Sequence, residues 1–441
     1  GGVAVAAAVI ASLLFVVAPR PELPLRMYTI AVLPIRNLTG DRTLDPAADK
    51  LTEDVAQVLG RGGYLYVAPR DASVAWRGKP IDDRFLGKLL HVRHIVNASL
   101  RKSGSDFRVS YQLVDTTSDA VVDSQNIGLA ASDGTLPEHA LAMTMFEDIT
   151  DVLHRRWAAD ELAKPPNDSD PDNVLARLEK ILNDGGRRNI RQVEHLAKIA
   201  DSAIPRNDGL RPVFDVDLCW YYASLLDRRA WTSMGQRGAW ASTALNSAGE
   251  AADLLPNSAS PHACRAETLG LLGRWEEGLA EAGFVIDNFP LTVVGYEARA
   301  NIELERGQFR ETLNDFTELT KRSGGSCEPE LGEAGGCHGE IGLVHLFLGD
   351  NDTAIAELRE QAVEGPGSDF PPFFLSAALE GSGNHGAAIV SAALYRRLKT
   401  DDAVWRLLSL SSEPAFLAPA QKIRTALHQA GLNEPAMRAK E

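Results

Sequence analysis

The residues of this chain most capable of chemistry are its four cysteines. Cys327 and Cys337 share one Gly-rich segment, residues 323–339, whose flexibility would let their Cβ atoms meet. We take this pair as a candidate disulfide, and closing so short a loop would stabilise the fold by roughly 2–3 kcal/mol. Two alternatives stay open, namely free thiols and a metal site recruiting His338 and His345, although the spacing matches no established zinc pattern.

The other two cysteines, Cys219 and Cys264, lie in apolar helical contexts. This setting predicts inert, unpaired core thiols. Nearby aromatic residues allow two interpretations, a ligand groove or an interhelical core, and the core is the more usual role. These aromatic residues are Trp231, Trp240, Trp275, Tyr221 and Tyr222.

Known catalytic spacings are missing from the sequence. It contains no phosphate-binding Gly-rich loop with its Lys, no His-Glu-x-x-His and no Gly-x-Ser-x-Gly. The many carboxylates form no defined pair and are interpreted as solvated helix faces. We therefore predict no catalytic residue, no cofactor and no metal ion for this region.

An internal period of 34 residues organises the second half of the chain, and it is the tetratricopeptide period. The pairs separated by this distance are Gly273 and Gly307, Gly349 and Gly383, and Pro256 and Pro290. Each glycine is expected in the tight turn between two helices, where a Cβ would resist the backbone conformation. Five units are predicted between about Val213 and Arg397, and the segment 413–433 reads as a final amphipathic helix that closes the array.

The spacing from Gly307 to Gly349 is longer than the period, so one unit carries 8 extra residues. They fall within residues 323–339. Insertions in a solenoid go to loops on one face, often the binding face.

The chain opens with 18 uncharged residues, GGVAVAAAVIASLLFVVA. This length is at the lower limit for a transmembrane helix, which we predict over 1–18, followed by a Pro-rich linker over 19–27. The alternatives are the apolar part of a signal peptide and a buried helix. Because the chain starts without Met, we expect a fragment, and Arg20 and Arg26 alone do not fix the orientation.

A mixed α/β unit is predicted next, over residues 28–130. Phe107 to Leu113 alternates apolar with polar residues, which is typical of a half-buried antiparallel strand. The other predicted strands are residues 29–35, 64–67, 94–100 and 120–127, with helices around 51–60 and 82–90. The order β-α-β-α-β-β-β predicts one sheet of mixed direction with packed helices.

Several blocks of this unit resemble the TolB amino-terminal-like domain. They are IAVLPIRNLTGD, LTEDVAQVL and VAPRDASVAWRGKPID, followed by the turn into FRVSYQLVD. The chain departs from the family at Leu90-His91-Val92, usually a glycine-rich LGV, and at Asn97-Ala98, usually Glu-Gly. In bacteria this domain often follows one membrane helix and precedes tetratricopeptide repeats. The resemblance then implies an upstream output domain, either a winged-helix DNA-binding domain or a class III nucleotide cyclase.

The full predicted organisation is a membrane helix (1–18), a linker (19–27), the TolB-like α/β domain (28–130), a helix and linker (131–172), a helical pair (173–212) and tetratricopeptide-like repeats with a capping helix (213–433). The fold class is thus α/β plus an all-α tetratricopeptide solenoid, with one N-terminal transmembrane helix.

The functional expectation combines the resemblance with the predicted anchor. It is the sensory and protein-interaction region of a one-pass bacterial inner-membrane signalling protein, a membrane-anchored transcriptional regulator with residues after 26 in the periplasm. The alternatives are the regulatory tail of a membrane-bound class III adenylate cyclase and a membrane-tethered scaffold. We expect a protein or peptide partner in the repeat groove and a possible homodimer. The net charge of -15 disfavours direct nucleic-acid binding.

Overall fold

The computed structural model describes residues 28–61, 65–74, 76, 82–103, 106–129, 136, 138–183, 190–206, 208–227, 233–256, 258–289, 292–322, 337–365, 367–399 and 403–434. The chain forms two compact units. One comprises the chain up to His139 with the segments Ile149–Arg155 and Ile204–Arg211, and the other comprises the rest. The predicted domain boundaries stay predictions.

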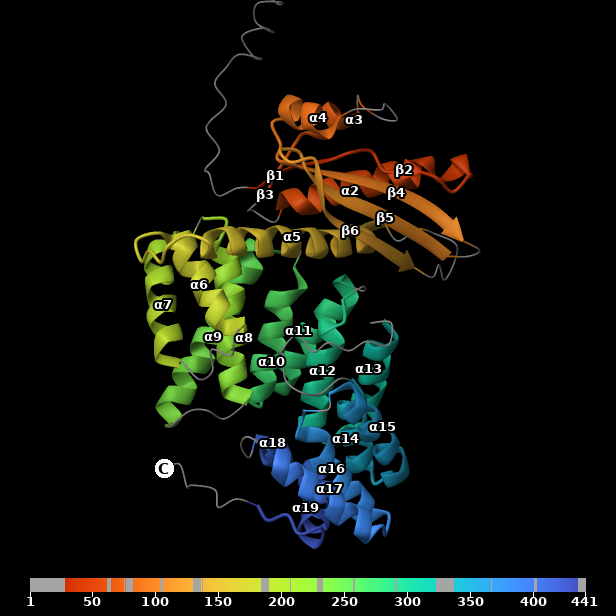
Figure 1. Cartoon of the computed structure of the whole chain (residues 1–441), viewed down its shortest axis with the longest axis vertical. Coiled ribbons are helices and arrows are strands. Elements are labelled where there is room, and N and C mark those ends of the chain that lie inside the picture. Colours follow the sequence, from red (N-terminus) through yellow and green to blue (C-terminus); the bar gives the residue numbers. More distant parts are fainter. Residues whose placement is uncertain are drawn as a thin grey trace, which may run out of the picture. The chain divides into compact units, whose positions relative to one another are not determined.

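The first unit contains a small mixed sheet (Figure 1). Its strands are β1 (Tyr28–Val32), β2 (Arg36–Asn37), β3 (Leu65–Val67), β4 (His94–Ser103), β5 (Asp106–Asp115) and β6 (Ala120–Leu129). The order is β3-β1-β4-β5-β6, and β2 pairs with β4. β1 runs parallel to β3 and β4, whereas β4, β5 and β6 are antiparallel. In β5, the alternation seen in the sequence buries Phe107, Val109, Tyr111 and Leu113.

Short helices accompany this sheet: η1 (Arg42–Leu44), α2 (Asp45–Arg61), α3 (Arg70–Val74) and α4 (Asp83–Leu90). On α2, Leu51 and Val55 are fully buried, and the Thr52 hydroxyl accepts a hydrogen bond from the backbone N–H of Ile35 at 2.9 Å. Helix α4 lies close to the β5–β6 turn, because a Cβ on Gly87 would come within 2.4 Å of the Thr116 side chain.

The second unit is built almost entirely of helices (Figure 1). They are α5 (Glu138–Leu162, shared with the first unit), α6 (Pro171–Asn183), α7 (Ile190–Ala203), α8 (Arg211–Asp227), α9 (Met234–Leu254), α10 (Ala259–Leu271), α11 (Trp275–Asn288), α12 (Val294–Glu305), α13 (Phe309–Arg322), α14 (Cys337–Leu348), α15 (Asn351–Glu364), α16 (Phe370–Gly381), α17 (His385–Leu398), α18 (Ala403–Arg406), η3 (Leu407–Ser409) and α19 (Pro414–Gln429). From α10 to α17 consecutive helices form pairs, as the period of 34 residues predicts.

The turn inside each of the last four pairs has the same backbone geometry. Its glycine has a positive φ: 74° at Gly273 and Gly307, and 81° at Gly349 and Gly383. The residue after the glycine donates its N–H to the carbonyl four residues before the glycine, as Arg274 does to Leu269 at 2.9 Å. This bond closes the first helix in a Schellman-type cap, for which glycine carries no Cβ penalty.

One apolar core runs through the helices from α12 to α19. Aromatic rings fill its centre, where Phe309, Phe347 and Phe416 contact one another from α13, α14 and α19. The second unit therefore holds together over long sequence distances.

The predicted fold class needs one correction. In the described part of the chain, every helix is too short or too polar to cross a membrane. The transmembrane helix predicted over 1–18 lies outside the described residues. The fold class that the described residues show is a mostly helical, tetratricopeptide-like solenoid with a small mixed sheet, and a membrane-spanning helix is not part of it.

Candidate interaction surface

A recurring polar bond joins the two helices of each of the last four pairs. The residue eight positions after each turn glycine lies on the second helix and bonds back to the first helix. The bonds are His262 Nδ1 to Glu281 (2.8 Å), Arg299 to Asp315 (2.7 and 2.6 Å), His338 Nδ1 to Glu357 (2.6 Å) and the Ser391 hydroxyl to the Pro372 carbonyl (3.0 Å). We call these the interhelical polar pairs. They fix the second helix against the first in each unit.

The pair of α12 and α13 is the most strongly bonded. Both oxygens of Asp315 accept from the Arg299 guanidinium, in the forked geometry that makes such bonds strong. The Asp315 side chain is 6% exposed and that of Arg299 is 33% exposed. One turn further along α12, Glu303 has a pKa raised to about 7, mainly by burial. The nearby Asp315 carboxylate also raises this pKa, and its effect is larger than the opposite effect of the Arg299 charge.

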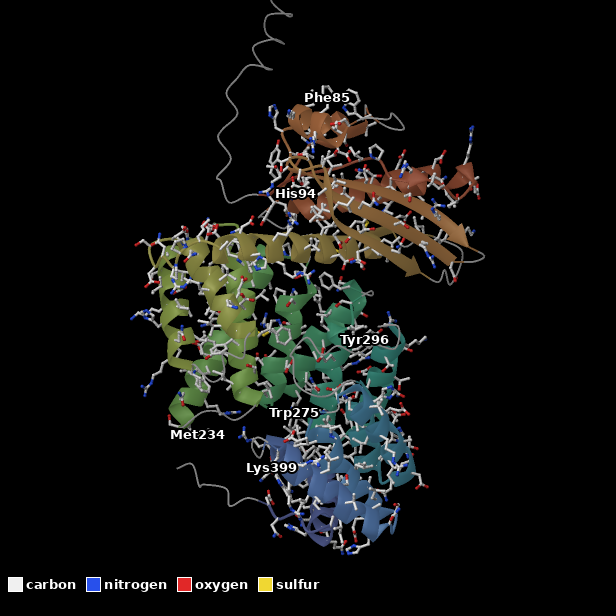
Figure 2. All side chains as sticks on the ribbon, viewed as in Figure 1. Phe85, His94, Met234, Trp275, Tyr296 and Lys399 are labelled. Atoms are coloured by element: carbon white, nitrogen blue, oxygen red, sulfur yellow. A yellow bond between two sulfur atoms is a disulfide. The ribbon has the colours of Figure 1, made fainter. Side chains whose placement is uncertain are left out.

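An aromatic side chain lies close to two guanidinium groups on the same helix pair. Tyr296 of α12 is labelled in Figure 2. The Arg322 guanidinium lies 4.8 Å and the Arg299 guanidinium 5.6 Å from its ring centroid. Tyr296 is half-buried, and about a third of each Arg side chain is exposed. We call Tyr296, Arg299, Glu303 and Arg322 the α12 surface. It offers a flat ring, cationic donors and a carboxyl group that titrates near neutral pH to a peptide.

A second perturbed carboxyl group lies on α14. Burial raises the pKa of Glu340 to about 8, and the Glu297 carboxylate of α12 adds to the shift. Helices α12 and α14 thus both carry carboxyl groups that are partly protonated at neutral pH.

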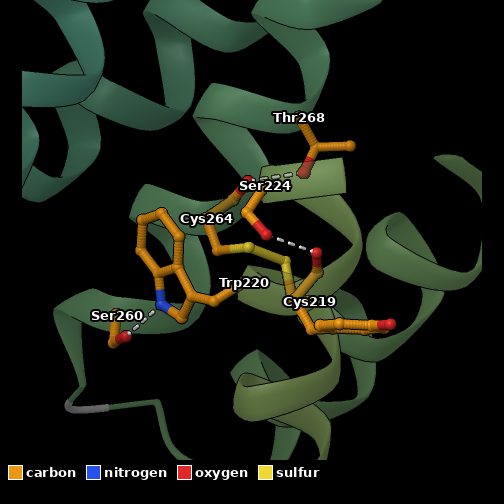
Figure 3. Close-up of a disulfide and its surroundings, with 7 residues drawn as sticks. Cys219, Trp220, Ser224, Ser260, Cys264 and Thr268 are labelled. Atoms are coloured by element: carbon orange, nitrogen blue, oxygen red, sulfur yellow. Dashed lines mark hydrogen bonds between the residues drawn. A yellow bond between two sulfur atoms is a disulfide. The ribbon is translucent and has the colours of Figure 1, made fainter. Parts of the chain in front are cut away.

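The cysteines pair differently from the prediction. Cys219 of α8 and Cys264 of α10 form a disulfide across 45 residues, with their Cα atoms 6.3 Å apart (Figure 3). The prediction of unpaired core thiols is therefore wrong, although their burial was predicted correctly, since both are 0% exposed. Beside the disulfide, Trp220 Nε1 donates to the Ser260 hydroxyl at 2.9 Å, which is a second bond between the same two helices.

The predicted pair of Cys327 and Cys337 is not tested. Cys327 lies outside the described residues, and of Cys337 only the backbone, at the start of α14, is described. Its disulfide with Cys327 stays a prediction. Pro256 lies two residues after the end of α9, whereas Pro290 lies outside the described residues.

Three of the aromatic residues weighed as groove residues are in the core. Tyr221, Tyr222 and Trp240 are 5%, 9% and 4% exposed. The ring centroid of Tyr222 lies 5.1 Å from that of Tyr221 and 6.3 Å from that of Trp240. Trp275 is half-buried, and Trp231 lies outside the described residues.

The described residues hold no group of three or more His, Cys, Asp or Glu side chains that could bind a metal ion. His338 bonds to Glu357, and His345 Nδ1 lies 3.2 Å from Asp350. Neither the α12 surface nor the interhelical polar pairs were predicted from the sequence. For the polar pairs one signal was available, the 19-residue spacing of His262 from Glu281, which His338 and Glu357 repeat.

The comparisons with known proteins match parts of the chain. No family model matches it. A segment of 99 residues, 22% of this chain, is 36% identical to "Putative adenylate cyclase 3" of Rhizobium meliloti (strain 1021). The match spans 17% of that relative's length.

Similar solved structures include both kinds of fold. TolB from Acinetobacter baumannii matches at a TM-score of 0.21 and 16% identity, over 30% of each chain. YrrB, described as a TPR protein with an unusual peptide-binding site, matches at 0.30 and 18%, over 42% of this chain and 98% of its own. Yeast Tom70 matches at 0.35 and 11%, over 87% and 76%. The architecture of this chain, a mixed α/β unit with a tetratricopeptide-like array, rests on the strand order, the repeat period and the turn geometry described above.

Proposed function

We propose that the repeat array is a protein-interaction module that binds a peptide segment of a partner. The observation that carries this proposal is the series of helix pairs at a 34-residue period, closed by glycine turns of one geometry. Stacked pairs of this kind create extended concave surfaces. The net charge of -15 supports a protein partner over nucleic acid.

The α12 surface is the part of the array that we assign to peptide contact. Contact with two guanidinium groups orders the Tyr296 ring before a ligand arrives, so little side-chain entropy is lost on binding. Tyr and Arg are also the residue types that contribute most to protein interfaces. Arg299 is bonded to the buried Asp315, so its replacement would destabilise the helix pair, whereas Arg322 pairs with the more exposed Glu318. Tyr296 and Arg322 are therefore the residues to test.

The experiment begins with selection of peptides from a random library on the immobilised full chain. The affinity of a selected peptide is then measured by calorimetry for the wild type and for the variants Tyr296→Ala and Arg322→Ala. We expect each variant to bind at least about tenfold more weakly, which corresponds to about 1.4 kcal/mol.

The matched control is Phe284→Ala, since Phe284 is an aromatic residue on α11 with 40% of its surface exposed. It should bind like the wild type. If no peptide is enriched, the proposed function is wrong. If peptides bind Tyr296→Ala and Arg322→Ala as tightly as the wild type, the α12 surface is not the contact site.

The wider context that we propose is a bacterial signalling protein in which this region senses and transmits. A second candidate, the regulatory region of a nucleotide cyclase, is favoured by the segment 36% identical to a putative adenylate cyclase. The transcriptional-regulator context rests on the TolB-like resemblance alone. Formation of cyclic AMP from ATP by the native polypeptide carrying this sequence would support the cyclase candidate, and its absence with Mg²⁺ and Mn²⁺ would exclude it.

For the location of the chain we propose an oxidising compartment outside the cytoplasm, the periplasm. Disulfides persist in such compartments and are rare in the bacterial cytosol, and the buried disulfide between Cys219 and Cys264 supports this assignment. Thiol blocking at lysis, followed by mass spectrometry, tests it. Recovery of both cysteines in the alkylated form would contradict the proposed location.

A further inference from the structure

The C-terminal helix α19 lies on the first helices of two repeat units. It packs against α16 and α14, which begin the last two helix pairs. Its buried residues are Phe416, Ala420, Ile423 and Leu427, at intervals of four, three and four. This is the single apolar stripe of an amphipathic helix that binds in a groove. The segment was predicted only to close the end of the array.

The receiving surface consists of α14, α16 and the Gly307 turn between α12 and α13, and we call it the C-terminal groove. The Phe416 ring lies 5.0 Å from Phe347 of α14 and 6.4 Å from Phe309 next to the turn. At the other end of α19, the His428 ring lies 6.2 Å from Trp405. Helix α19 therefore reaches three successive helix pairs.

Gly307 differs from the other turn glycines in what surrounds it. A Cβ there would lie 2.7–2.8 Å from the Cβ and backbone of Ala415 and the backbone nitrogen of Phe416. At Gly273, which has the same φ of 74°, a Cβ would meet no heavy atom within 4 Å among the described residues. Gly307 thus serves two purposes, since it permits the turn and leaves room for the backbone of α19.

Helix α19 contributes one apolar stripe to the core, and in its other features it resembles a bound helical ligand. Only its one stripe is buried, and Leu417 is 41% exposed, whereas α16 buries nine of its 12 residues. Pro419 lies inside α19 and removes one backbone hydrogen bond, so the isolated helix is weak. The helix depends on the groove, and the four residues 410–413 connect it to η3.

We propose that α19 is an internal ligand of the C-terminal groove, and that a partner protein binds there by replacing it with an amphipathic helix of the same pattern. The pattern is a large aromatic, a small, a β-branched and a large aliphatic residue at i, i+4, i+7 and i+11. The helix is basic, because α19 carries Lys422 and Arg424 and no acidic residue, in a chain of net charge -15. This inference rests on the proposed interaction function and adds the partner's chemistry and its control by the chain itself.

The test uses the full chain with Gly307→Ala, which pushes α19 out, and Gly273→Ala as the control with the same turn strain. Hydrogen exchange reports the opening of α19, and fluorescence anisotropy reports binding of a labelled peptide of residues 411–434. We expect Gly307→Ala to exchange α19 amides at least tenfold faster and to bind the peptide at least tenfold more tightly than the wild type. In Gly273→Ala both quantities should stay at the wild-type values. Phe416→Ala weakens the same contact without strain in the turn and serves if Gly307→Ala does not fold.

Three results would overturn the proposal. In the first, the amides of α19 exchange only when the whole unit unfolds, in every variant, which makes the helix a permanent cap. In the second, α19 opens but the peptide does not bind, or a peptide with Phe416→Ala and Leu427→Ala binds equally well. In the third, the opened chain forms a dimer that the peptide does not dissociate, which makes a second copy the occupant. The test of the proposed function depends on Tyr296 and Arg322, which are not part of the C-terminal groove, so failure of this proposal is distinguishable from failure of the proposed function.

Discussion

Reduction of the disulfide between Cys219 and Cys264 should destabilise the helical unit strongly. The bond joins α8 to α10 across α9 and closes a loop of 45 residues. In the chain-entropy model, a loop of that length restricts the unfolded chain by about 4 kcal/mol at 25 °C. Both cysteines are fully buried, so the reduced thiols remain in place as small apolar groups and the loss is mainly that of the cross-link.

Urea unfolding of oxidised and reduced protein measures this term. Trp220, which bonds to Ser260 beside the disulfide, provides a local fluorescence signal, and hydrogen exchange of α8 and α10 assigns the transition to this region. With a urea dependence of about 3 kcal/mol per molar, typical of the larger single domains, the midpoint should fall by about 1.3 M on reduction.

The second pair of cysteines must be separated from this effect. A chain with Cys327→Ser and Cys337→Ser should show the same difference between oxidised and reduced protein. Free energies of unfolding that agree within about 0.5 kcal/mol for the two redox states would refute the reasoning, because the cross-link would then not restrict the unfolded chain. A reductant effect that vanishes in the double Ser variant would assign the stabilisation to the other pair.

Three further predictions concern ion pairs and carboxyl groups. Arg299→Met leaves the buried Asp315 carboxylate unpaired and should destabilise the unit by about 2 kcal/mol in urea, whereas adding Asp315→Leu should restore most of it. The pKa of Glu303 is raised to about 7, so the stability linked to its protonation is complete below the unfolded pKa near 4.5 and is lost as pH rises through 7. Compared with the wild type, Glu303→Gln should therefore be more stable by about 1 kcal/mol at pH 8, after allowance for the partial exposure of Glu303, and almost equally stable at pH 5. Urea unfolding at both pH values measures the difference. Burial alone would raise the pKa of Asp115, but hydrogen bonds from Thr117 and Ser118 and the charge of Arg93 lower it to about 2. The ionised carboxylate therefore contributes about 2 kcal/mol to the stability of the fold above pH 4, and this contribution is lost as pH falls towards 2. Asp115→Asn should make the acid unfolding of the sheet, followed by circular dichroism, less steep.

Local sequence patterns predicted most of the secondary structure because each pattern reports burial of one face. The alternation in β5 and the repeated turn glycines are signals that a few neighbouring residues carry completely. By contrast, β2 is two residues long and α3 five, and segments this short carry no period to detect.

The disulfide and the position of α19 could not be predicted in the same way, because both depend on which helices become neighbours. Cys219 and Cys264 belong to different helix pairs, and nothing in their local sequence distinguishes a thiol facing apolar side chains from a thiol facing another thiol. For α19, the stripe predicted an apolar partner but not which surface supplies it. That surface depends on the Gly307 turn, about a hundred residues earlier in the chain.

The interhelical polar pairs show why this array keeps its period while its side chains vary. The position eight residues after the turn glycine holds Glu281, Asp315, Glu357 and Ser391, and each bonds back to the first helix of its own pair. The bonding partner on the first helix is a His ring, a guanidinium group or a backbone carbonyl. The bonded groups therefore differ between units, while the bond between the two helices is kept. An unbonded polar group between packed helices would cost about 1–3 kcal/mol, so any residue that completes the bond is tolerated there. The turn glycines have no such freedom, because a positive φ admits few other residues. Evolution can therefore replace the half-exposed residues of these polar pairs to suit a binding partner without loss of the fold. On the α12 surface, Arg299 is such a residue.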